Sequence, residues 1–330
     1  MKVVSIGGGT GLSALLRGLK VYVNASPPPR LLEPAISRLT AVVTVTDEGG
    51  SSGLLRREFG MLPPGDIRNC LVALAEDEQI LTRVFQYRFS RGLGLRGHSL
   101  GNLFLTALTD LTGDFAAAVR RASEILAVRG EIFPATLADV RLQALLANGQ
   151  TVKGEAAISS TASPIRQLSI VPHNCAPLRE TLDAIEAADL ITVGPGSLYT
   201  SLIPNLLVRG IPEQIERSAA RKVYVTNLMT QPGETTGYTA ADHLRALIEH
   251  SGRNFFHYAL LNTRPLPSEL IRRYASEGAE PVANDLEAIR ALGVEPAFAP
   301  LLAEQDHVAR HNPQALAHLV LSLASDSQRL

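Results

Sequence analysis

Short runs of consecutive apolar residues alternate along the chain with longer stretches in which apolar residues recur at helical spacing. After the first run, Leu12, Leu15 and Leu19 lie three or four positions apart, which predicts a helix directly behind a strand. The runs that predict buried strands are residues 2–6, 42–46, 190–193, 222–227 and 255–261. Strands separated by helices are typical of a parallel sheet that is covered on both faces. The pattern therefore predicts an α/β fold, a three-layer sandwich with a mainly parallel sheet.

Two segments depart from this alternation. Residues from about 66 to 131 show mostly helical spacing, so we expect a mostly helical insertion at about 54–131 within a single domain of residues 1–330. From about 137 to 159 apolar and polar residues alternate instead, and Asn148-Gly149 is a typical hairpin turn. This segment predicts an antiparallel β-hairpin at one edge of the sheet, with Ala156 and Ile158 in its returning strand.

Four of the predicted strands end in loops rich in glycine and small hydroxyl residues. Such loops offer backbone N–H groups and hydroxyls to an anionic, oxygen-rich ligand. Because ligands bind beyond the carboxyl ends of parallel strands, we expect these loops to meet at one rim. The alternative for any single loop is an ordinary strand-to-helix turn, with Thr10 as a helix cap. The candidate ligand-binding residues in the loops are Gly8, Gly9, Thr10, Gly11, Asp47, Ser51, Ser52, Gly196, Ser197, Tyr199 and Thr230.

Two predicted helix starts add polar candidates. Asp66 is expected to cap a helix whose first turn contains Arg68 and Asn69. His98 and Asn102 lie in a glycine-flanked turn that opens another helix. A lone histidine in such a turn serves either the structure or a ligand, and the sequence leaves both roles open.

The first glycine loop does not match the dinucleotide-binding fingerprint. The pattern G-x-G-x-x-G needs a third glycine, but Gly7 and Gly9 are followed by Leu12. The glycines still let a phosphate approach the backbone where the helix begins. We therefore expect an anion site at this turn, without NAD as its cofactor.

Composition and charge exclude several classes of function. The 330-residue chain has a formal net charge of −1 and no block of basic residues, which argues against a nucleic-acid partner. Aromatic residues make up 5% of the chain and tryptophan is absent, so base-stacking surfaces are not expected. No apolar run reaches the length of a membrane span, and residues 2–6 lead into glycines rather than into a signal peptide. We expect a cytoplasmic protein in which Cys70 and Cys175 are reduced structural thiols.

Six motifs follow one another between residues 7 and 235. They are residues 7–13 (GGGTGLS), 47–53 (DEGGSSG), 63–69 (PPGDIRN), 97–102 (GHSLGN), 194–201 (GPGSLYTS) and 229–235 (MTQPGET). In this combination and order they resemble the YvcK-like gluconeogenesis factor family, a branch of the superfamily of 2-phospho-L-lactate transferase. The resemblance implies a Rossmann-like fold in a cytoplasmic protein.

The resemblance also implies a ligand and a biological role. It implies binding of UDP-sugars such as UDP-N-acetylglucosamine, and a requirement for the protein in cell shape and wall synthesis during gluconeogenic growth. By motif, the tyrosine and arginine that serve UDP-sugar binding in the family correspond to Tyr274 and Arg310. An arginine can form paired hydrogen bonds to a diphosphate, and a tyrosine can stack on uracil or bind a ribose.

One position departs from the family pattern. The family commonly has two aspartates where this chain has Asp47 and Glu48, and in the lactate-transferase branch these acids belong to the active site. The first functional hypothesis is a non-catalytic regulator that binds a UDP-sugar and acts on cell-wall synthesis or regulatory proteins, with a homodimer as a candidate assembly.

The alternative hypothesis is a Mg²⁺-dependent phosphate-ester transferase. Asp47 and Glu48 are its catalytic candidates, while loop amides and Arg68 stabilise phosphate charge. No metal ligand can be assigned beyond these acids. A dinucleotide-dependent oxidoreductase ranks lowest, because the fingerprint is broken and no hydride-transfer set of side chains stands out.

Overall fold

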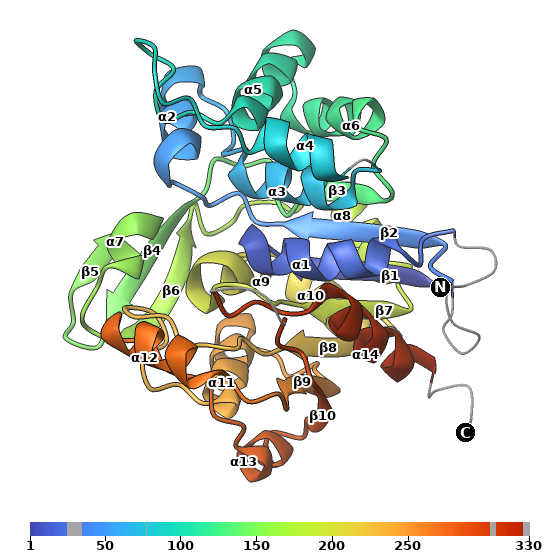
Figure 1. Cartoon of the computed structure of the whole chain (residues 1–330), viewed down its shortest axis with the longest axis vertical. Coiled ribbons are helices and arrows are strands. Elements are labelled where there is room, and N and C mark those ends of the chain that lie inside the picture. Colours follow the sequence, from blue (N-terminus) through green and yellow to red (C-terminus); the bar gives the residue numbers. More distant parts are fainter. Residues whose placement is uncertain (25–34, 77, 304–307, 326–330) are drawn as a thin grey trace.

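The computed structural model describes residues 1–24, 35–76, 78–303 and 308–325, and its centre is a seven-stranded sheet (Figure 1). Neighbouring strands all pair in parallel, in the order β10-β9-β8-β7-β1-β2-β3. The predicted parallel sheet is therefore confirmed. The strands are β1 (Lys2–Gly7), β2 (Arg38–Val43), β3 (Glu131–Pro134), β7 (Leu190–Val193), β8 (Arg221–Val225), β9 (Tyr258–Asn262) and β10 (Glu295–Ala299).

The direction in which strands are added to the sheet reverses at β1. The chain first adds β2 and β3 on one side of β1, and then adds β7, β8, β9 and β10 on the other. Such a reversal leaves a crevice beyond the carboxyl ends of the two strands that flank it. In this fold those strands are β1 and β7, which places the crevice next to the first glycine loop.

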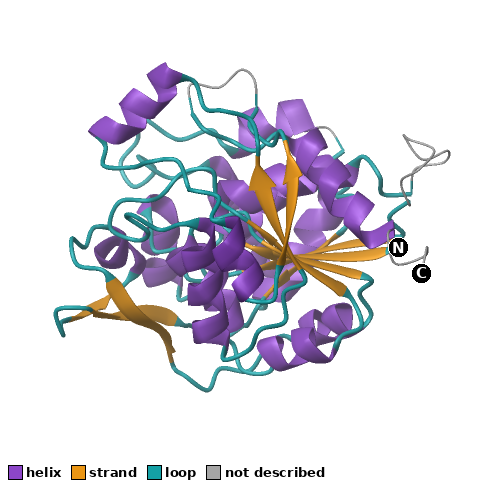
Figure 2. Ribbon diagram, turned by 90° about the horizontal axis from the view of Figure 1, so that it is seen from below, coloured by secondary structure: helices purple, strands orange, loops and turns teal. Residues whose placement is uncertain are grey.

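Helices lie on both sides of the sheet, as Figure 2 shows. The helix α1 (Gly9–Lys20) packs against both α3 (Gly65–Leu74) and α14 (Pro313–Ser325), and its predicted apolar face is buried in the core. None of the described helices is both long and apolar enough to span a bilayer. The remaining elements of this layer structure are α8 (Arg179–Glu186), η1 (Leu198–Leu202), α9 (Ile203–Leu206), α10 (Ile211–Arg217), α11 (Ala240–Ser251), α12 (Ser268–Ser276) and α13 (Leu286–Ala291).

The described residues between β2 and β3 are mostly helical. Besides α3 they form α2 (Gly50–Phe59), α4 (Glu78–Phe85), α5 (Leu100–Thr112) and α6 (Phe115–Ile125). Ser99 and Asp114 cap α5 and α6 by accepting backbone N–H groups at 3.3 and 2.6 Å. The predicted cap at Asp66 is wrong, because α3 begins at Gly65 and Asp66 lies inside its first turn. Its carboxylate is therefore available for another contact.

The predicted hairpin exists, but it does not extend the edge of the main sheet. Its strands β4 (Arg141–Leu146) and β5 (Thr151–Lys153) join β6 (Ile165–Val171) in a separate antiparallel sheet of the order β5-β4-β6. Ala156 and Ile158, which were assigned to the returning strand, lie in the short helix α7 (Glu155–Ser159) instead. Gly154 has a φ of 88°, a positive value that glycine adopts easily, and the chain leaves the strand at this residue.

Gly18 of α1 lies where α14 packs closest. A Cβ at Gly18 would lie 2.0 Å from the Pro313 carbonyl oxygen and 2.9 Å from the Ala317 Cβ. We expect Gly18→Ala to lower the free energy of unfolding by about 1–3 kcal/mol, because overpacking outweighs the better helix propensity of alanine. Urea unfolding measures the change. Gln314→Ala, at an exposed position of α14, is the control, and equal stability of Gly18→Ala and the native protein would contradict this packing.

Candidate functional site

The predicted loops meet at one rim of the sheet because they follow four neighbouring strands, β8, β7, β1 and β2. The loops after β1 and β7 are in contact, since a Cβ at Gly11 would lie 2.5 Å from the Pro195 carbonyl oxygen. Asn227 joins the loops after β7 and β8: its Nδ2 donates to the Gly196 carbonyl at 2.8 Å, and its Oδ1 accepts the Gly196 N–H at 3.3 Å. The predicted convergence is confirmed.

Two buried threonines bring the loop after β2 to the same rim. The strand β2 ends earlier than predicted, but the chain beyond it keeps its contact with the neighbouring segments. The Thr44 N–H donates to the Gly7 carbonyl at 3.1 Å, and the Thr46 hydroxyl donates to the Thr200 carbonyl at 3.3 Å. The next residue, Asp47, therefore begins its loop at the rim.

A pocket of about 600 Å³, which we call the rim pocket, lies between these loops, α1 and the residues that precede α14. The predicted ligand-binding residues that line it are Gly8, Gly9, Thr10, Gly11, Asn69, Gly196, Ser197, Thr230, Tyr274 and Arg310. Other polar residues in its lining are Ser13, Arg17, Gln86, Ser201, Asn227, Gln231 and His311. The described lining contains two arginines and neither aspartate nor glutamate, so its formal charge is positive.

The glycine turn forms the wall of the rim pocket at the N-terminus of α1. Gly8 occupies the N-cap position, no side chain caps the helix, and Thr10 lies inside the first turn. Gly9 has a φ of 64°, which glycine adopts more easily than other residues. Backbone N–H groups at a helix start attract anions. One of them, the Gly9 N–H, donates to the carboxylate of Asp66.

Tyr274 and Arg310 are linked through one backbone hydrogen bond. The Tyr274 hydroxyl accepts the Ala309 N–H at 3.1 Å, and Arg310 follows directly as an exposed residue. Tyr274 therefore holds the backbone that carries Arg310. The next residue, His311, is buried, with its Nε2 3.1 Å from the Thr226 carbonyl oxygen, and burial lowers the pKa of His311 to about 4. Because this pKa lies well below physiological pH, the imidazole of His311 is neutral there.

Three carboxyl groups, Asp47, Asp66 and Glu155, form a carboxyl cluster beside the glycine turn. Burial, reinforced by the charge of Asp47, raises the pKa of Asp66 to about 7. Burial and the charge of Asp47 also raise the pKa of Glu155, to about 8. Glu155 comes from α7, and its Oε2 accepts the Glu48 N–H at 2.9 Å. Carboxyl groups that exchange protons near neutral pH are candidates for acid–base chemistry.

The side chain of Glu48 takes part in an ion-pair network and does not join the carboxyl cluster. Its Oε1 lies 3.6 Å from guanidinium nitrogens of both Arg56 and Arg141. Arg56 is buried and also pairs with Asp139. A buried guanidinium group needs such counter-charges. The structure therefore places the two sequence-predicted acids, Asp47 and Glu48, in different surroundings.

The other predicted polar residues connect the helices behind the carboxyl cluster. Ser51 Oγ lies 3.0 Å from His98 Nδ1, and Asn102 Nδ2 donates to Ser52 Oγ at 3.3 Å. Arg68 donates to the side chain that caps α5 at 2.7 Å. These contacts tie α2 and α3 to α5, and none of the five residues is part of the rim-pocket lining. Their placement fits the structural role that the sequence left open for His98.

Tyr199 lies in the core rather than in the rim pocket. Its ring is buried, and its hydroxyl lies 2.8 Å from the Tyr238 hydroxyl. The backbone of η1 turns this side chain inward, whereas Ser197, which precedes η1, lines the pocket. The small-residue pattern of the loop predicted its position at the rim but not the direction of each side chain.

Several polar residues of the site were not singled out from the sequence. Asn227 and Gln231 follow β8, whereas the predicted strand ended at Asn227 itself. The position of these two residues at the end of a predicted strand and in the loop after it was a usable signal. Gln231 Nε2 donates to Ser197 Oγ at 2.9 Å. Asp66 was expected only as a helix cap. Glu155 gave no signal, because it reaches the site from a helix that follows a different sheet.

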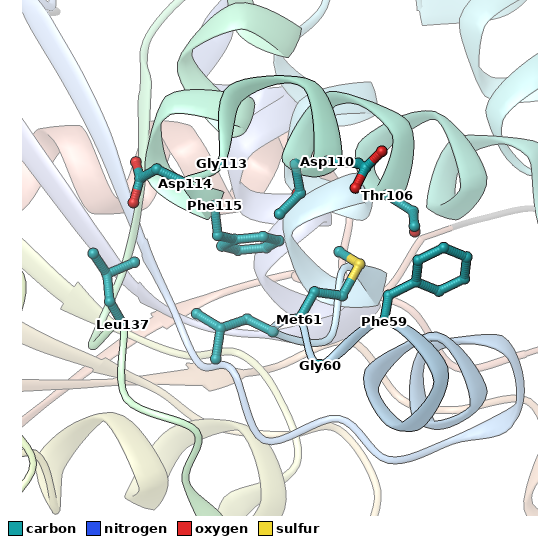
Figure 3. Close-up of a pocket in the computed structure, with 11 residues that line it drawn as sticks. Phe59, Gly60, Met61, Thr106, Asp110, Gly113, Asp114, Phe115 and Leu137 are labelled. Carbon is teal, nitrogen blue, oxygen red and sulfur yellow. The ribbon is translucent and has the colours of Figure 1, made fainter.

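A separate cavity of about 370 Å³ lies between the end of α2 and the helices α5 and α6 (Figure 3). Phe59, Met61, Phe115 and Leu137 supply much of its wall, and Asp110 and Asp114 lie at its border. None of the sequence-predicted site residues belongs to its described lining. The candidate site is therefore assigned to the rim pocket and the adjoining carboxyl cluster.

Comparison with known proteins agrees with this fold. The profile of the 2-phospho-L-lactate transferase CofD family matches residues 3–302. The chain belongs to this family.

Within the CofD family, the chain is similar to gluconeogenesis factors. The gluconeogenesis factor of Bacillus subtilis is 46% identical over 325 residues, which cover 98% of each chain. That of Halalkalibacterium halodurans is 47% identical over 97% of this chain and 95% of its own. The crystal structure of a Bacillus halodurans protein has a TM-score of 0.91 and 47% identity, and covers 97% of this chain and 99% of that chain. The Rossmann-like α/β fold is thereby confirmed.

The carboxyl cluster predicts a pH dependence of stability. Folding raises the carboxyl pKa values from 3.8 to about 7 at Asp66 and from 4.5 to about 8 at Glu155. The folded state therefore holds more protons than the unfolded chain between about pH 4 and pH 8, and the free energy of unfolding falls as the pH rises through this window. Asp66→Asn should reduce this fall and stabilise the protein at pH 8 by about 1–3 kcal/mol.

Urea unfolding of both proteins at pH 5 and pH 8 tests this expectation. Glu124→Gln, which alters an exposed carboxylate of α6, is the control and should leave the pH dependence unchanged. An Asp66→Asn protein with the native pH dependence would show that Asp66 is not the group responsible.

Proposed function

We propose that this CofD-family protein is a non-catalytic regulator that binds a UDP-sugar, such as UDP-N-acetylglucosamine, in the rim pocket. The observation that carries the proposal is the composition of the pocket lining. Backbone N–H groups of a glycine turn and two arginines line a volume of about 600 Å³ that no described carboxylate enters. Pockets of this size hold ligands of the size of a nucleotide.

The parts of the pocket suit the parts of a UDP-sugar. The diphosphate fits the N-terminus of α1, where backbone N–H groups and the helix dipole favour negative charge. Arg310 can form charge-assisted hydrogen bonds to phosphate oxygens, and Tyr274 offers a ring for stacking. The side-chain amides of Asn69, Asn227 and Gln231 can bind hydroxyl groups or the base.

The proposed biological role follows the family. Relatives that share nearly the whole chain are named gluconeogenesis factors. We infer that the protein acts in the cytoplasm, reports the supply of sugar nucleotides to cell-wall synthesis or regulatory proteins, and supports cell shape during gluconeogenic growth.

The carboxyl cluster favours a second candidate, a phosphate-ester transferase. A carboxyl group with a pKa near 7, next to an anion-binding turn, can accept a proton from an attacking hydroxyl. The described residues contain no group of three or more histidine, cysteine or acidic side chains arranged to hold a metal. Asp47 and Asp66 carry the oxygen ligands that Mg²⁺ prefers, so such an ion would be held by these carboxylates together with phosphate oxygens and would neutralise phosphate charge.

Substitutions at Arg310 and Tyr274 test the UDP-sugar site. Arg310→Ala should raise the Kd for UDP-N-acetylglucosamine by about 10–100-fold, because it removes a hydrogen bond to a charged group. Tyr274→Phe should raise the Kd by about 3–10-fold, because it releases the Ala309 N–H and loosens the backbone of Arg310. Titration calorimetry measures both changes.

Each substitution has a matched control. Arg179→Ala alters an exposed arginine of α8 that pairs with Asp183, and Tyr199→Phe alters a tyrosine hydroxyl outside the pocket. Both control proteins should bind with the native Kd. Native binding by Arg310→Ala and Tyr274→Phe would remove the C-terminal part of the proposed site, and absence of binding by the native protein would remove the UDP-sugar proposal.

The two candidate functions differ in what happens to the ligand. We expect UDP-N-acetylglucosamine incubated with the protein and Mg²⁺ to be recovered unchanged, because Glu48 is engaged with Arg56 and Arg141. Chromatography of the nucleotides after incubation checks this outcome. Release of UMP or UDP, lost in an Asp47→Asn protein and retained in Glu124→Gln, would support the transferase instead.

A further inference from the structure

A second polar pocket, of about 400 Å³, lies at the opposite end of the main sheet from the rim pocket. We call it the basal pocket. Its lining includes Arg221 at the start of β8, Tyr258 at the start of β9 and Glu295 at the start of β10, together with His257 and with Arg290 of α13. Parallel strands begin at one edge and end at the other, so the two pockets are separated by the length of β8, about 15 Å.

Arg221 is held in place on one side of the basal pocket. Its Nη1 donates to the Tyr258 hydroxyl at 3.1 Å, and its guanidinium carbon lies 5.5 Å from the centre of the Tyr258 ring. Contacts of this kind orient the planar guanidinium group. No described carboxylate forms an ion pair with Arg221. Its positive charge therefore has no direct counter-charge in the described part of the chain.

His257 presents an N–H donor of known position. The Lys222 backbone N–H donates to His257 Nδ1 at 3.0 Å, so the neutral imidazole carries its proton on Nε2. Burial and the positive charges of Lys222 and Arg221 lower the pKa of His257. The ammonium group of Lys222 is buried and donates to the Ser218 carbonyl, so its charge remains close to the ring. Glu216 of α10 attracts that ammonium group but is itself paired with Arg253.

Arg290 and Glu295 form the opposite border of the basal pocket. The two side chains are about half exposed, and Arg290 Nη2 lies 3.8 Å from Glu295 Oε1. At this distance the pair is a loose surface ion pair, which contributes little to stability. Glu295 is the single acidic residue in the described lining. The pocket thus combines two guanidinium groups and an imidazole N–H with one weakly engaged carboxylate.

We propose that the basal pocket binds a phosphate group, either as inorganic phosphate or as part of a small phosphorylated metabolite. Arginine suits this role because its planar donors match phosphate oxygens in pairs. The His257 Nε2–H supplies a further donor between strands β8 and β9. Glu295 competes with the ligand for Arg290 and sets the affinity. This site is separate from the rim pocket and does not depend on the function proposed for it.

A titration of the full-length protein with inorganic phosphate tests the proposal. The imidazole NMR signals of His257, assigned with His257→Gln, are followed while sodium chloride keeps the ionic strength constant. We expect these signals to shift and to saturate at millimolar phosphate. Arg290→Gln should raise the Kd by about tenfold, because it removes one charged donor, and Glu295→Gln should lower the Kd, because it removes the competing carboxylate.

The controls separate the basal pocket from other sites and from screening by salt. Arg310→Ala in the rim pocket and Arg179→Gln on α8 should leave the His257 titration unchanged. Shifts of equal size with chloride alone, no shift with phosphate, or an Arg290→Gln protein with the native Kd would overturn the proposal. Because Arg290 is exposed, its substitution should leave the thermal unfolding temperature unchanged, which calorimetry verifies.

A second titration distinguishes the two sources of the phosphate group. Glucose 6-phosphate that binds more tightly than inorganic phosphate identifies a phosphorylated metabolite as the ligand, whereas equal or weaker binding identifies free phosphate. Glucose itself, which lacks the phosphate, should not shift the His257 signals.

Discussion

The close approach of two backbones, at Gly11 and Pro195, fixes the glycine turn beside the loop after β7. A Cβ at Gly11 would lie 2.5 Å from the Pro195 carbonyl oxygen, and a Cβ at Gly8 would lie 2.5 Å from Asp66 Oδ2. The glycine turn is thus enclosed by the loop after β7 on one side and by α3 on the other. Gly8 and Gly11 are therefore required by these contacts alone. The open side of the turn faces the rim pocket, so an anion that uses the start of α1 must enter there.

This arrangement separates two kinds of charge across a few residues of backbone. The rim pocket carries the arginines, and the carboxyl cluster lies beyond the glycine turn. Asp66 already accepts the Gly9 N–H, so the positive end of α1 stabilises this acid. The other side of the same helix end remains open to a ligand. The raised pKa of Asp66 also means that the group can be neutral near pH 7. A neutral carboxyl group repels a bound phosphate far less than a carboxylate, which allows the two sites to adjoin.

The sequence predicted five of the seven strands, the parallel sheet and the meeting of the loops, because each depends on a local pattern repeated along the chain. The two outer strands, β3 and β10, were not predicted. The direction in which each side chain points depends on tertiary packing, so the sequence alone did not predict it. Tyr199 and Ser197 share one loop, yet η1 turns the tyrosine into the core and leaves the serine in the pocket. The hairpin was recognised, but its pairing with β6 could not be read from alternation alone, since alternation gives the buried face and not the partner strand.

The position of Glu48 shows why family membership does not by itself decide between binding and catalysis. Glu48, the second acid of the motif, forms an ion pair with the buried guanidinium group of Arg56. A guanidinium group removed from water needs carboxylates nearby to offset the loss of hydration. Glu155 of α7, from a distant part of the chain, lies beside Asp47 instead. Its carboxylate accepts a hydrogen bond from the Glu48 backbone N–H. The pair of acids next to Asp47 is therefore Asp66 and Glu155, and both hold their protons more tightly than ordinary carboxyl groups. A cluster of this kind is a weaker metal ligand at neutral pH than two ionised aspartates, because a proton must leave before a cation can bind. That cost favours the proposed non-catalytic regulator over the proposed transferase.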